Sequence, residues 1–466
     1  MNKKNNQLRR LPGVDAVLNE PGIKKLITEY GRDMAVYSAR KVISAMREEI
    51  KSGGLDFQKD ILFNRINDTV YKIARDRFKP VINATGILIH TNLGRAPLGE
   101  YAAAELEKTI AGYTNLEFDL ATGRRGRRND LIAPLINFLT GAEDSLVVNN
   151  NAAALLIILH TFARGKEVIV SRGELVEIGD SFRIPDMLRA AGAKMVEVGT
   201  TNRTRLCDYE KALTPRTALI LKVHKSNYAI TGFTEEVSVK DLSGFSHKQA
   251  IPFVYDIGSG LLRKPKGFTL ENEPEVKGAI GHGADMVTFS GDKLIGGPQA
   301  GIITGRKDLI RRIARAPMMR ALRVGKLTLA ALIVTCRQYL NDKERKSKTP
   351  LFTLLERSKR QRKEMAVNLM EELRKQNIAA TMVKNKGCCG GGTLPELYID
   401  SFAVCLNFPY QNNKERVHAA EKTFRELLRI DKPIIAILRK GEILFDVLAL
   451  LPQDIPYIAE QAAKTR

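Results

Sequence analysis

Short apolar runs and helical periodicity alternate along the middle of the chain. Each apolar run has strand character and is bounded by polar or glycine-rich turns. Helical segments fill the intervals, as at 152–162, which is apolar, 184–191 and 209–213. The expected strands are 145–148, 168–170, 194–198, 218–223, 253–255, 286–289 and 302–304. Strands that alternate with helices predict an α/β domain with a mostly parallel sheet, whose ligand lies at the carboxyl ends of the strands.

The first 79 residues follow a different pattern, which is helical throughout. A long amphipathic segment at 32–51 places apolar residues at helical spacing, and two glycines end it at 53 and 54. Helical spacing resumes at 56–79, until Pro80 stops it. Residues 1–80 hold 17 Lys and Arg against 10 Asp and Glu. We therefore expect a separate, basic helical domain at this end of the chain.

A helix expected at 328–339 leads into a third region. Its expected elements are a helix at 369–376, a glycine-rich turn at 387–392, and strands at 402–406, 434–439 and 442–446. The sequence thus predicts three domains. They are an N-terminal helical domain at 1–79, a large α/β domain at 80–335 and a smaller C-terminal α+β domain at 336–466.

Composition narrows the class of protein. The chain has 466 residues, too many for one ordinary core, and its 44% hydrophobic and 27% charged residues are typical of a globular protein. The net charge of +22 favours a polyanionic partner such as nucleic acid, with a solvated basic surface as the alternative. No apolar segment resembles a signal peptide or approaches the roughly 20 residues of a membrane span. We therefore expect a cytoplasmic protein without a membrane partner.

The five cysteines form no recognisable site. Their number is odd and they lack paired Cys-x-x-Cys spacing, so we expect neither a disulfide framework nor a metal site. Cys388 and Cys389 are adjacent, and a disulfide between neighbours is strained. We expect a buried or half-buried pair of thiols in a glycine-rich turn.

The segment 283–305 carries the strongest chemical signal. Between two apolar runs, a glycine-rich loop holds a single lysine, Lys293. A lysine enclosed by small and apolar neighbours loses hydration, which lowers the pKa of its ammonium group and makes the free amine available. A free amine can form a Schiff base with an aldehyde cofactor. The alternative is a solvated lysine in a hairpin loop.

Neighbouring residues supply what pyridoxal phosphate requires. Ser290 stands three residues before Lys293, and the loop at 296–301 offers unobstructed backbone N–H groups, which suit the phosphate. Asp256 ends another expected strand, where a carboxylate can pair with the protonated ring nitrogen. A turn-initiating aspartate before Gly258 is the alternative. Together these residues favour a pyridoxal-phosphate enzyme anchored at Lys293.

Two further strand ends are candidates for cofactor contacts. Asn150, Asn151 and Ala152 stand between an expected strand and the start of a helix, a common place for a bound phosphate. His224 and Asn227 follow another strand and are placed to contact the cofactor ring or its O3′ oxygen. Each of these residues alone would be an ordinary loop residue.

Arginines recur in the same region. Arg95 stands between small residues and could hold an anion, although such an arginine is more often a surface charge. Arg320 and Arg323 are three apart, so on a helix they would share a face and could grip one oxyanion together. The segment 122–129, Thr-Gly-Arg-Arg-Gly-Arg-Arg-Asn, is a basic loop that contacts phosphates or is simply solvated, two interpretations of equal weight.

Several of these segments together resemble one family, bacterial selenocysteine synthase, also called L-seryl-tRNA(Sec) selenium transferase. The resemblance runs over almost the whole chain. Ser-Arg-Gly-Glu-Leu-Val-Glu-Ile-Gly at 171–179 and Phe-Ser-Gly-Asp-Lys-Leu at 289–294 are specific to this family and its near relatives. Other matching segments are 8–18, 82–98, 119–129, 147–154, 197–205, 221–235 and 320–329.

The resemblance implies a fold-type-I pyridoxal-phosphate transferase in which Lys293 carries the Schiff base. It also implies that the N-terminal helical domain binds tRNA(Sec), and that the chain assembles as a homo-oligomer, usually a decameric ring of dimers. Arg95, Arg320 and Arg323 match arginines that bind the oxyanion of selenophosphate, the selenium donor. The implied reaction is β-replacement on seryl-tRNA(Sec), with Lys293 removing the Cα proton and Asp256 keeping the ring protonated.

Two positions depart from the family pattern, and two rival functions remain. Lys225 stands where threonine is expected and Gly325 where aspartate is expected, and either change could alter ion pairing near the site. One rival function is a pyridoxal-phosphate lyase or β-eliminase that acts on a small amino acid. The other is a basic RNA-binding protein whose α/β body is structural.

Overall fold

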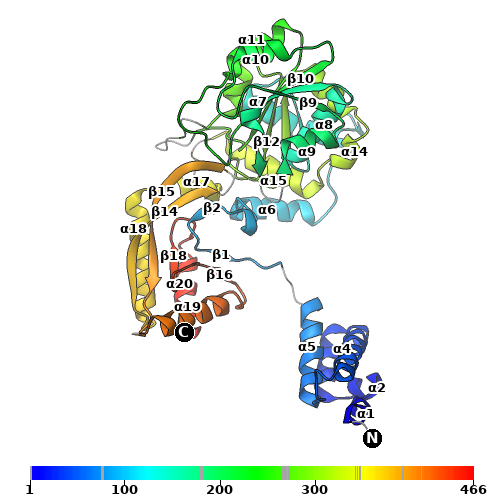
Figure 1. Ribbon diagram of the computed structural model, residues 1–466, viewed down its shortest axis with the longest axis vertical. Helices are drawn as coiled ribbons and strands as arrows, with labels where there is room; N and C mark the ends of the chain where they lie inside the picture. Colours follow the sequence, from blue (N-terminus) through cyan, green and yellow to red (C-terminus); the bar gives the residue numbers. More distant parts are fainter. Residues whose placement is uncertain are drawn as a thin grey trace. The chain divides into compact units, whose positions relative to one another are not determined.

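The computed structural model describes residues 3–74, 78–178, 182–264, 270, 273–341, 343, 345, 348–390, 393–410 and 412–465. The chain divides into two compact units, residues 1–80 and residues 81–466. Figure 1 shows the elements of both units, coloured along the sequence. No helix within the described ranges combines the length and apolar character needed to cross a membrane.

The N-terminal unit is entirely helical, as the sequence predicts. Its helices are α1 (Lys3–Arg10), α2 (Val14–Leu18), α3 (Pro21–Tyr30), α4 (Arg32–Ser52) and α5 (Lys59–Ala74). Gly53 ends α4 in the left-handed conformation, at φ 84°, which glycine adopts without strain. Apolar residues at helical spacing on α4, such as Ala39, Ile43 and Met46, pack against Leu62 and Ile66 of α5 in one core. The unit therefore has a hydrophobic core of its own.

A seven-stranded sheet forms the centre of the larger unit. Its order is β5-β13-β12-β11-β10-β6-β9. The strands are β5 (Asp144–Val148), β6 (Glu167–Ser171), β9 (Lys194–Val198), β10 (Thr217–Val223), β11 (Phe253–Gly258), β12 (Met286–Ser290) and β13 (Gly301–Gly305). β13 runs antiparallel to both of its neighbours, and the other pairs are parallel. The predicted mostly parallel sheet is confirmed.

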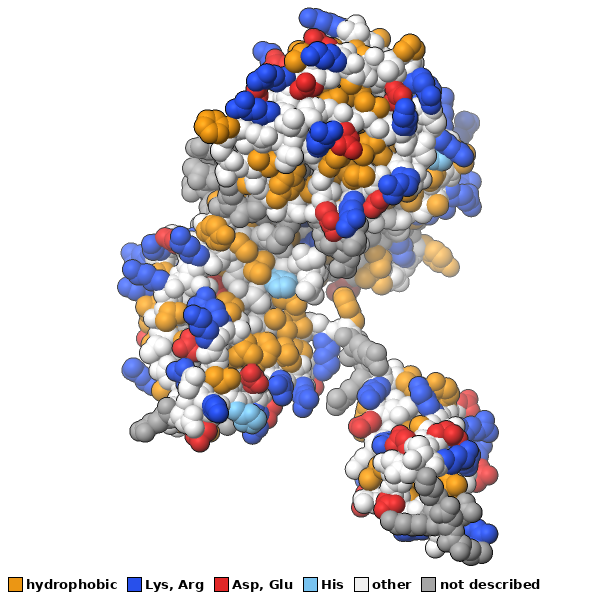
Figure 2. Space-filling view, in the orientation of Figure 1, with side chains coloured by type: hydrophobic (Ala, Val, Ile, Leu, Met, Phe, Trp, Pro, Cys, Tyr) orange, Lys and Arg blue, Asp and Glu red, His pale blue; other side chains and the backbone are white. Residues whose placement is uncertain are grey.

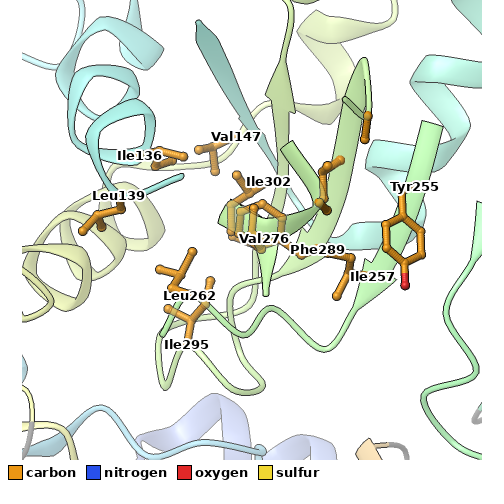
Figure 3. Close-up of a cluster of buried hydrophobic side chains, with 14 of the residues drawn as sticks. Ile136, Leu139, Val147, Tyr255, Ile257, Leu262, Val276, Phe289, Ile295 and Ile302 are labelled. Atoms are coloured by element: carbon orange, nitrogen blue, oxygen red, sulfur yellow. The ribbon is translucent and has the colours of Figure 1, made fainter. Parts of the chain in front are cut away.

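Helices cover both faces of this sheet. On one face lie α7 (Ala133–Thr140), α10 (Leu206–Ala212), α11 (Val239–Lys248), α12 (Val276–Gly281) and α15 (Lys326–Gln338). On the other lie α8 (Asn151–Ala163), α9 (Ile184–Ala190) and α13 (Lys307–Ala314). Figure 3 shows the first core, where Phe289, Ile302 and Val147 of adjacent strands approach Ile136 of α7. Because both faces are buried, polar chemistry is left to the strand ends.

A second sheet of five strands has the order β17-β18-β15-β14-β2. Its strands are β2 (Ile87–Ile89), β14 (Ala380–Gly390), β15 (Thr393–Leu406), β17 (Ile437–Arg439) and β18 (Glu442–Asp446). α18 (Lys359–Lys375), α19 (Asn413–Leu427) and α20 (Asp454–Lys464) pack against it in one core. In Figure 1 the long hairpin of β14 and β15 lies beside α18. An α+β region at the C-terminal end agrees with the sequence analysis.

The boundaries expected for the large domain differ from the structure at both ends. β2 pairs with β14, and β1 (Ile82–Asn83) pairs with β16 (Ile434–Ile435), so residues 82–89 complete the C-terminal sheets. The boundary expected after residue 335 falls inside α15. The hydrophobic pattern of a strand indicates which of its faces are buried, but it does not indicate which distant strand will pair with it.

The expected glycine-rich turn at 387–392 is wrong over its described part. Residues 387–390 continue β14, while 391 and 392 lie outside the described residues. A Cβ at Gly387 would collide with the backbone of Gly86 and the side chain of Leu448, so this glycine marks a close approach rather than a turn. Cys388 is half-buried and Cys389 is buried, and both are free thiols, as expected.

Shorter elements complete the larger unit. They are α6 (Gly99–Ile110), α14 (Met319–Leu322), α17 (Pro350–Leu355), and the hairpins β3 (Phe118–Asp119) with β4 (Arg124–Arg125) and β7 (Glu177–Ile178) with β8 (Phe182–Arg183).

Candidate active site

Lys293 lies in the loop that follows β12, at the carboxyl-end edge of the large sheet. The residue is 8% exposed. Burial, and then the nearby guanidinium of Arg95, lower the pKa of the Lys293 ammonium group, while the carboxylates of Asp256, Asp292 and Glu273 act in the opposite direction. The lowered pKa agrees with the expectation from the sequence. The structure also shows that three acidic side chains surround this amine.

Asp256 lies near the carboxyl end of β11, the strand beside β12. Its Oδ1 accepts hydrogen bonds from Asn151 Nδ2 at 2.7 Å and from Thr288 Oγ1 at 3.0 Å. Burial raises the pKa of Asp256, and these two hydrogen bonds and the charge of Lys293 partly oppose that rise. Both donors use one oxygen of the carboxylate, so Oδ2 is the atom suited to a cationic partner.

His224 follows β10 and is tied to the same site. Its backbone N–H donates to the carbonyl of Asp256 at 2.8 Å, and its Nε2 lies 3.2 Å from Glu273 Oε2. Glu273 is 4% exposed, and its Oε1 has no hydrogen-bond partner within the described residues. Sequence analysis missed Glu273, because a glutamate in the acidic stretch Glu-Asn-Glu-Pro-Glu (271–275 of the sequence) carries no motif. Asn227 donates to the carbonyl of Glu177 at 2.8 Å.

The three residues at the start of α8 have different tasks. Asn150 caps the helix, since its Oδ1 accepts the Ala153 N–H at 2.8 Å. Asn151 holds Asp256, and Ala152 adds a backbone N–H to the first turn. Ser290 pairs with Gly301, which in turn pairs with Val148 just before this turn. These pairings bring Ser290 and the start of α8 to one edge of the sheet, where a phosphate can bind.

Arg95 is placed beside Lys293 by its contact with Asp292. Arg95 Nη1 lies 2.7 Å from Asp292 Oδ2, while Asp292 Oδ1 is buried with no hydrogen-bond partner among the described residues. The backbone of Arg95 has φ 63°, a left-handed conformation that costs about 1–3 kcal/mol in a residue other than glycine. Its N–H donates to the carbonyl of His90 at 3.0 Å, which helps to hold this conformation.

Arg320 and Arg323 do not share a helix face, so that prediction is wrong. α14 ends at Leu322, and Arg323 is extended, with φ −71° and ψ 142°, and bridges to Val148. The edge of β5 provides a pairing partner that draws the chain out of the helix. Both arginines nevertheless line one cleft of ≈ 530 Å³, together with Arg125 and Arg128 of the basic loop. No ion pair within the described residues joins either of them to Asp292, which pairs with Arg95.

The two departures from the family pattern have different consequences. Lys225 Nζ forms an ion pair with Glu236 Oε2 at 2.7 Å, and the same oxygen lies 3.9 Å from Nζ of the buried Lys222. Gly325 is the N-cap of α15 and supplies no side-chain hydrogen bond to the helix. Lys225 therefore adds an ion pair directly beside His224, whereas Gly325 removes a possible helix cap.

Two family models match the chain. The model described as L-seryl-tRNA selenium transferase matches residues 81–451, and the model described as selenocysteine synthase N terminal matches residues 8–47. Among curated relatives, the L-seryl-tRNA(Sec) selenium transferase of Moorella thermoacetica is 42% identical over 96% of this chain and 94% of its own. That of Clostridium botulinum strain Okra is 41% identical over 98% of both chains.

A solved structure shares the fold. The structure of D-glucosaminate-6-phosphate ammonia-lyase superimposes with a TM-score of 0.58 at 20% identity, covering 85% of this chain and 98% of its own. At this level of identity the likeness concerns the fold alone.

Proposed function

The chain belongs to the L-seryl-tRNA selenium transferase family, and from this premise we propose that it converts seryl-tRNA(Sec) to selenocysteinyl-tRNA(Sec). The observation that carries the proposal is the buried Lys293, whose pKa is lowered and which lies among Arg95, Asp292 and Asp256. This arrangement provides a base, an anion-binding group and a buried carboxylate within one site.

Pyridoxal phosphate is the cofactor that these residues fit. Three buried polar atoms, Asn151 Oδ1, Glu273 Oε1 and Asp292 Oδ1, lack hydrogen-bond partners within the described residues. Buried polar atoms are normally paired, so a cluster of unpaired ones around Lys293 indicates a polar ligand. When bound, the cofactor would supply an aldehyde that accepts an amine and a ring that withdraws electrons from Cα.

Each residue of the site can be given a role toward this cofactor. Lys293 would anchor the aldehyde, and Asp256 Oδ2 would accept the ring N–H. Ser290 and the start of α8, formed by Asn150, Asn151 and Ala152, would hold the phosphate. His224 and Asn227 would contact the ring or its O3′ oxygen, with His224 held in place by Glu273.

The chain's own residues then divide the chemistry of β-replacement. The amine of Lys293, whose pKa is lowered by burial and by Arg95, takes the Cα proton of the seryl group. Asp256, buried and hydrogen-bonded, stabilises positive charge on its ligand. Arg95, Arg320 and Arg323 attract selenophosphate, the anionic donor whose selenium takes the place of the seryl hydroxyl on Cβ while its phosphate is released by hydrolysis. In the structure Arg95 reaches the site through Asp292, whereas the other two arginines lie in the cleft along β5.

We assign tRNA binding to the N-terminal unit. It is compact, carries an excess of seven positive charges, and contains the match to the family's N-terminal model at residues 8–47. On the exposed side of α4, Arg40, Lys41 and Arg47 accompany Tyr37, whose ring centroid lies 5.8 Å from Lys41 Nζ. Figure 2 shows Lys and Arg spread over the visible face of each unit. A tRNA substrate places the enzyme in the cytoplasm.

Exposed apolar side chains support assembly as a homo-oligomer. Ile110, Tyr113, Leu120 and Phe138 are exposed large hydrophobic residues that lie close together in the sequence, on α6, the following loops and α7. Exposed groups of this kind mark protein interfaces. A ring of dimers, usually a decamer in this family, would cover them.

The proposed function is tested by Lys293→Ala. The purified protein should show absorbance at roughly 400–430 nm from its cofactor and should transfer selenium to seryl-tRNA(Sec). The variant should lose both the band and the activity. Turnover that survives in Lys293→Ala would contradict the assignment of this residue.

The alternative function, a lyase or β-eliminase for a small amino acid, is not favoured. The two relatives described above, which match this chain over 94% and 98% of their own lengths, are selenium transferases. The likeness to the ammonia-lyase shows the fold only. Deletion of residues 1–80, a unit with its own core, separates the two functions. The deletion should abolish turnover of seryl-tRNA(Sec), and unchanged turnover would contradict the tRNA-binding role of this unit. Turnover of a free amino acid that the deletion leaves unchanged, in a chain that does not act on seryl-tRNA(Sec), would argue for the alternative.

A further inference from the structure

The basic loop 122–129 forms one wall of the cleft along β5. Its residues from Arg125, the end of β4, to Asn129 line the cleft together with residues of α13, α14 and the start of β5. The charged residues of the lining are Glu117, Arg125, Arg127, Arg128, Asp130, Asp144, Arg311, Arg320 and Arg323. The structure thus brings the basic loop, for which the sequence allows phosphate contacts or simple solvation, together with Arg320 and Arg323.

The cleft keeps a surplus of positive charge. Glu117 forms ion pairs with three arginines. Its Oε1 lies 2.7 Å from Arg128 Nε and 3.4 Å from Arg323 Nη1, and its Oε2 lies 3.2 Å from Arg125 Nη2. These arginines, Arg128 first, lower the pKa of Glu117, which therefore stays ionised. One carboxylate cannot neutralise three guanidinium groups.

Three further arginines in the lining have no acidic partner. No ion pair in the described part of the chain involves the guanidinium groups of Arg127, Arg311 or Arg320, and all three residues are exposed. The arginines come from three separate elements, the loop 122–129, α13 and α14. Several arginines without an acidic partner in one cleft suit a ligand with several phosphates better than one small oxyanion.

The inner end of the cleft leads toward the cofactor-binding residues. Arg323 bridges to Val148 at the end of β5, and the Asn149 N–H donates to the carbonyl of Leu322 at 2.9 Å. Asn151, which holds Asp256, follows Val148 by three residues. Three residues span at most about 10 Å. A ligand that lies along the cleft can therefore reach the site of Asp256 and Lys293.

We propose that Arg125, Arg127 and Arg311 of this cleft bind backbone phosphates of the 3′-terminal segment of the RNA substrate. This inference rests on the proposed function, because the reacting serine is esterified to that end of the RNA. Arg320 and Arg323 remain at the inner end, where a small anionic donor can meet the seryl group. The cleft would guide the RNA end to Lys293, whereas the N-terminal unit holds the body of the RNA.

The test compares two RNAs and two variants. Arg125→Ala/Arg127→Ala removes two exposed charges from the cleft, and Arg189→Ala removes an exposed arginine from α9, outside it. Affinity is measured by filter binding over a range of salt, for intact tRNA(Sec) and for the same RNA without its last four nucleotides. The cleft variant should bind the intact RNA less tightly, and the slope of its salt dependence should fall by about one for each phosphate that is no longer neutralised.

The truncated RNA should bind the cleft variant and the wild type equally, and Arg189→Ala should bind both RNAs as the wild type does. Arg125→Lys/Arg127→Lys should restore most of the affinity, because it keeps the charges. Unchanged binding of intact RNA, an equal loss of affinity with both RNAs, or a change only in the KM for selenophosphate would overturn the inference. A wild-type protein that binds the RNA but transfers no selenium would contradict the proposed function and leave this comparison valid.

Discussion

Arg95 and Asp292 form an ion pair of 2.7 Å directly beside the candidate catalytic lysine. Asp292 precedes Lys293 in the chain, so the charge of Arg95 is coupled to the amine through an adjacent residue. Asp292 uses one oxygen for this contact, and its other oxygen is buried without a hydrogen-bond partner among the described residues. An anion that approaches Arg95 must therefore compete with Asp292, and its binding would change the electrostatic environment of Lys293.

Substitution of Arg95 and substitution of Asp292 should have opposite effects on the pKa of Lys293. Arg95 lowers that pKa and Asp292 raises it, so Arg95→Ala should raise it and Asp292→Asn should lower it further. The measurement is the pH dependence of reductive labelling of Lys293 by pyridoxal in protein freed of cofactor, followed by peptide mapping. Asp186→Asn, which removes a carboxylate that pairs with Arg189 on the surface, is the control. Shifts of the two variants in the same direction would show that the coupling is not electrostatic.

Asp256→Asn should stabilise the cofactor-free protein while it abolishes turnover. Burial raises the folded-state pKa of Asp256, so its favourable contribution to stability is complete below the ordinary aspartate pKa, about 3.9, and is lost as the pH rises through the folded-state value. Asparagine keeps an oxygen for Asn151 and Thr288 but has no charge to bury. Melting temperature is measured from pH 4 to pH 8. An Asn variant that is less stable than the wild type at neutral pH would refute the argument.

Glu273→Ala should weaken the site more than Glu273→Gln. Alanine leaves His224 Nε2 without its partner, which costs about 1–3 kcal/mol, or roughly five- to a hundredfold in cofactor affinity. Glutamine keeps a hydrogen-bonding group at this position. The dissociation constant of pyridoxal phosphate and the position of its absorbance band are measured for both variants. Glu275→Gln, in the same loop, is the control, and equal behaviour of all three variants would exclude a positioning role for Glu273.

Gly387→Ala should destabilise the larger unit. Its Cβ would collide with the Gly86 backbone and with Leu448, and overpacking of this kind costs about 1–3 kcal/mol. Gly278→Ala is a matched control, because its Cβ would meet no atom within 4 Å and alanine favours the helix α12. Thermal unfolding followed by circular dichroism distinguishes them. A variant of Gly387 that melts with the wild type would show that the strands separate easily at this point.

The local sequence was sufficient for the strands and helices of the large sheet. Apolar runs such as 168–170 and 286–289 were found within a residue of β6 and β12, because buried parallel strands are apolar on both faces. Lys293 was identified for a similar reason, since one lysine in a glycine-rich loop between two such strands is a local pattern. Asn151 and Asp256 were placed at strand ends, and the structure joins them by a hydrogen bond of 2.7 Å.

Contacts between distant segments were decided by the tertiary structure. β2 pairs with β14 although Ile87 and Cys388 lie far apart in the chain, Glu273 reaches His224 from an unremarkable acidic stretch, and Arg323 leaves a helix to pair with Val148. The hydrophobic periodicity and composition of a segment indicate which of its own faces are buried. The contacts named here depend on a second segment that the fold places beside the first. The sequence by itself thus identified Lys293, Asn151 and Asp256 as site residues, whereas the tertiary structure decided which side chains they contact.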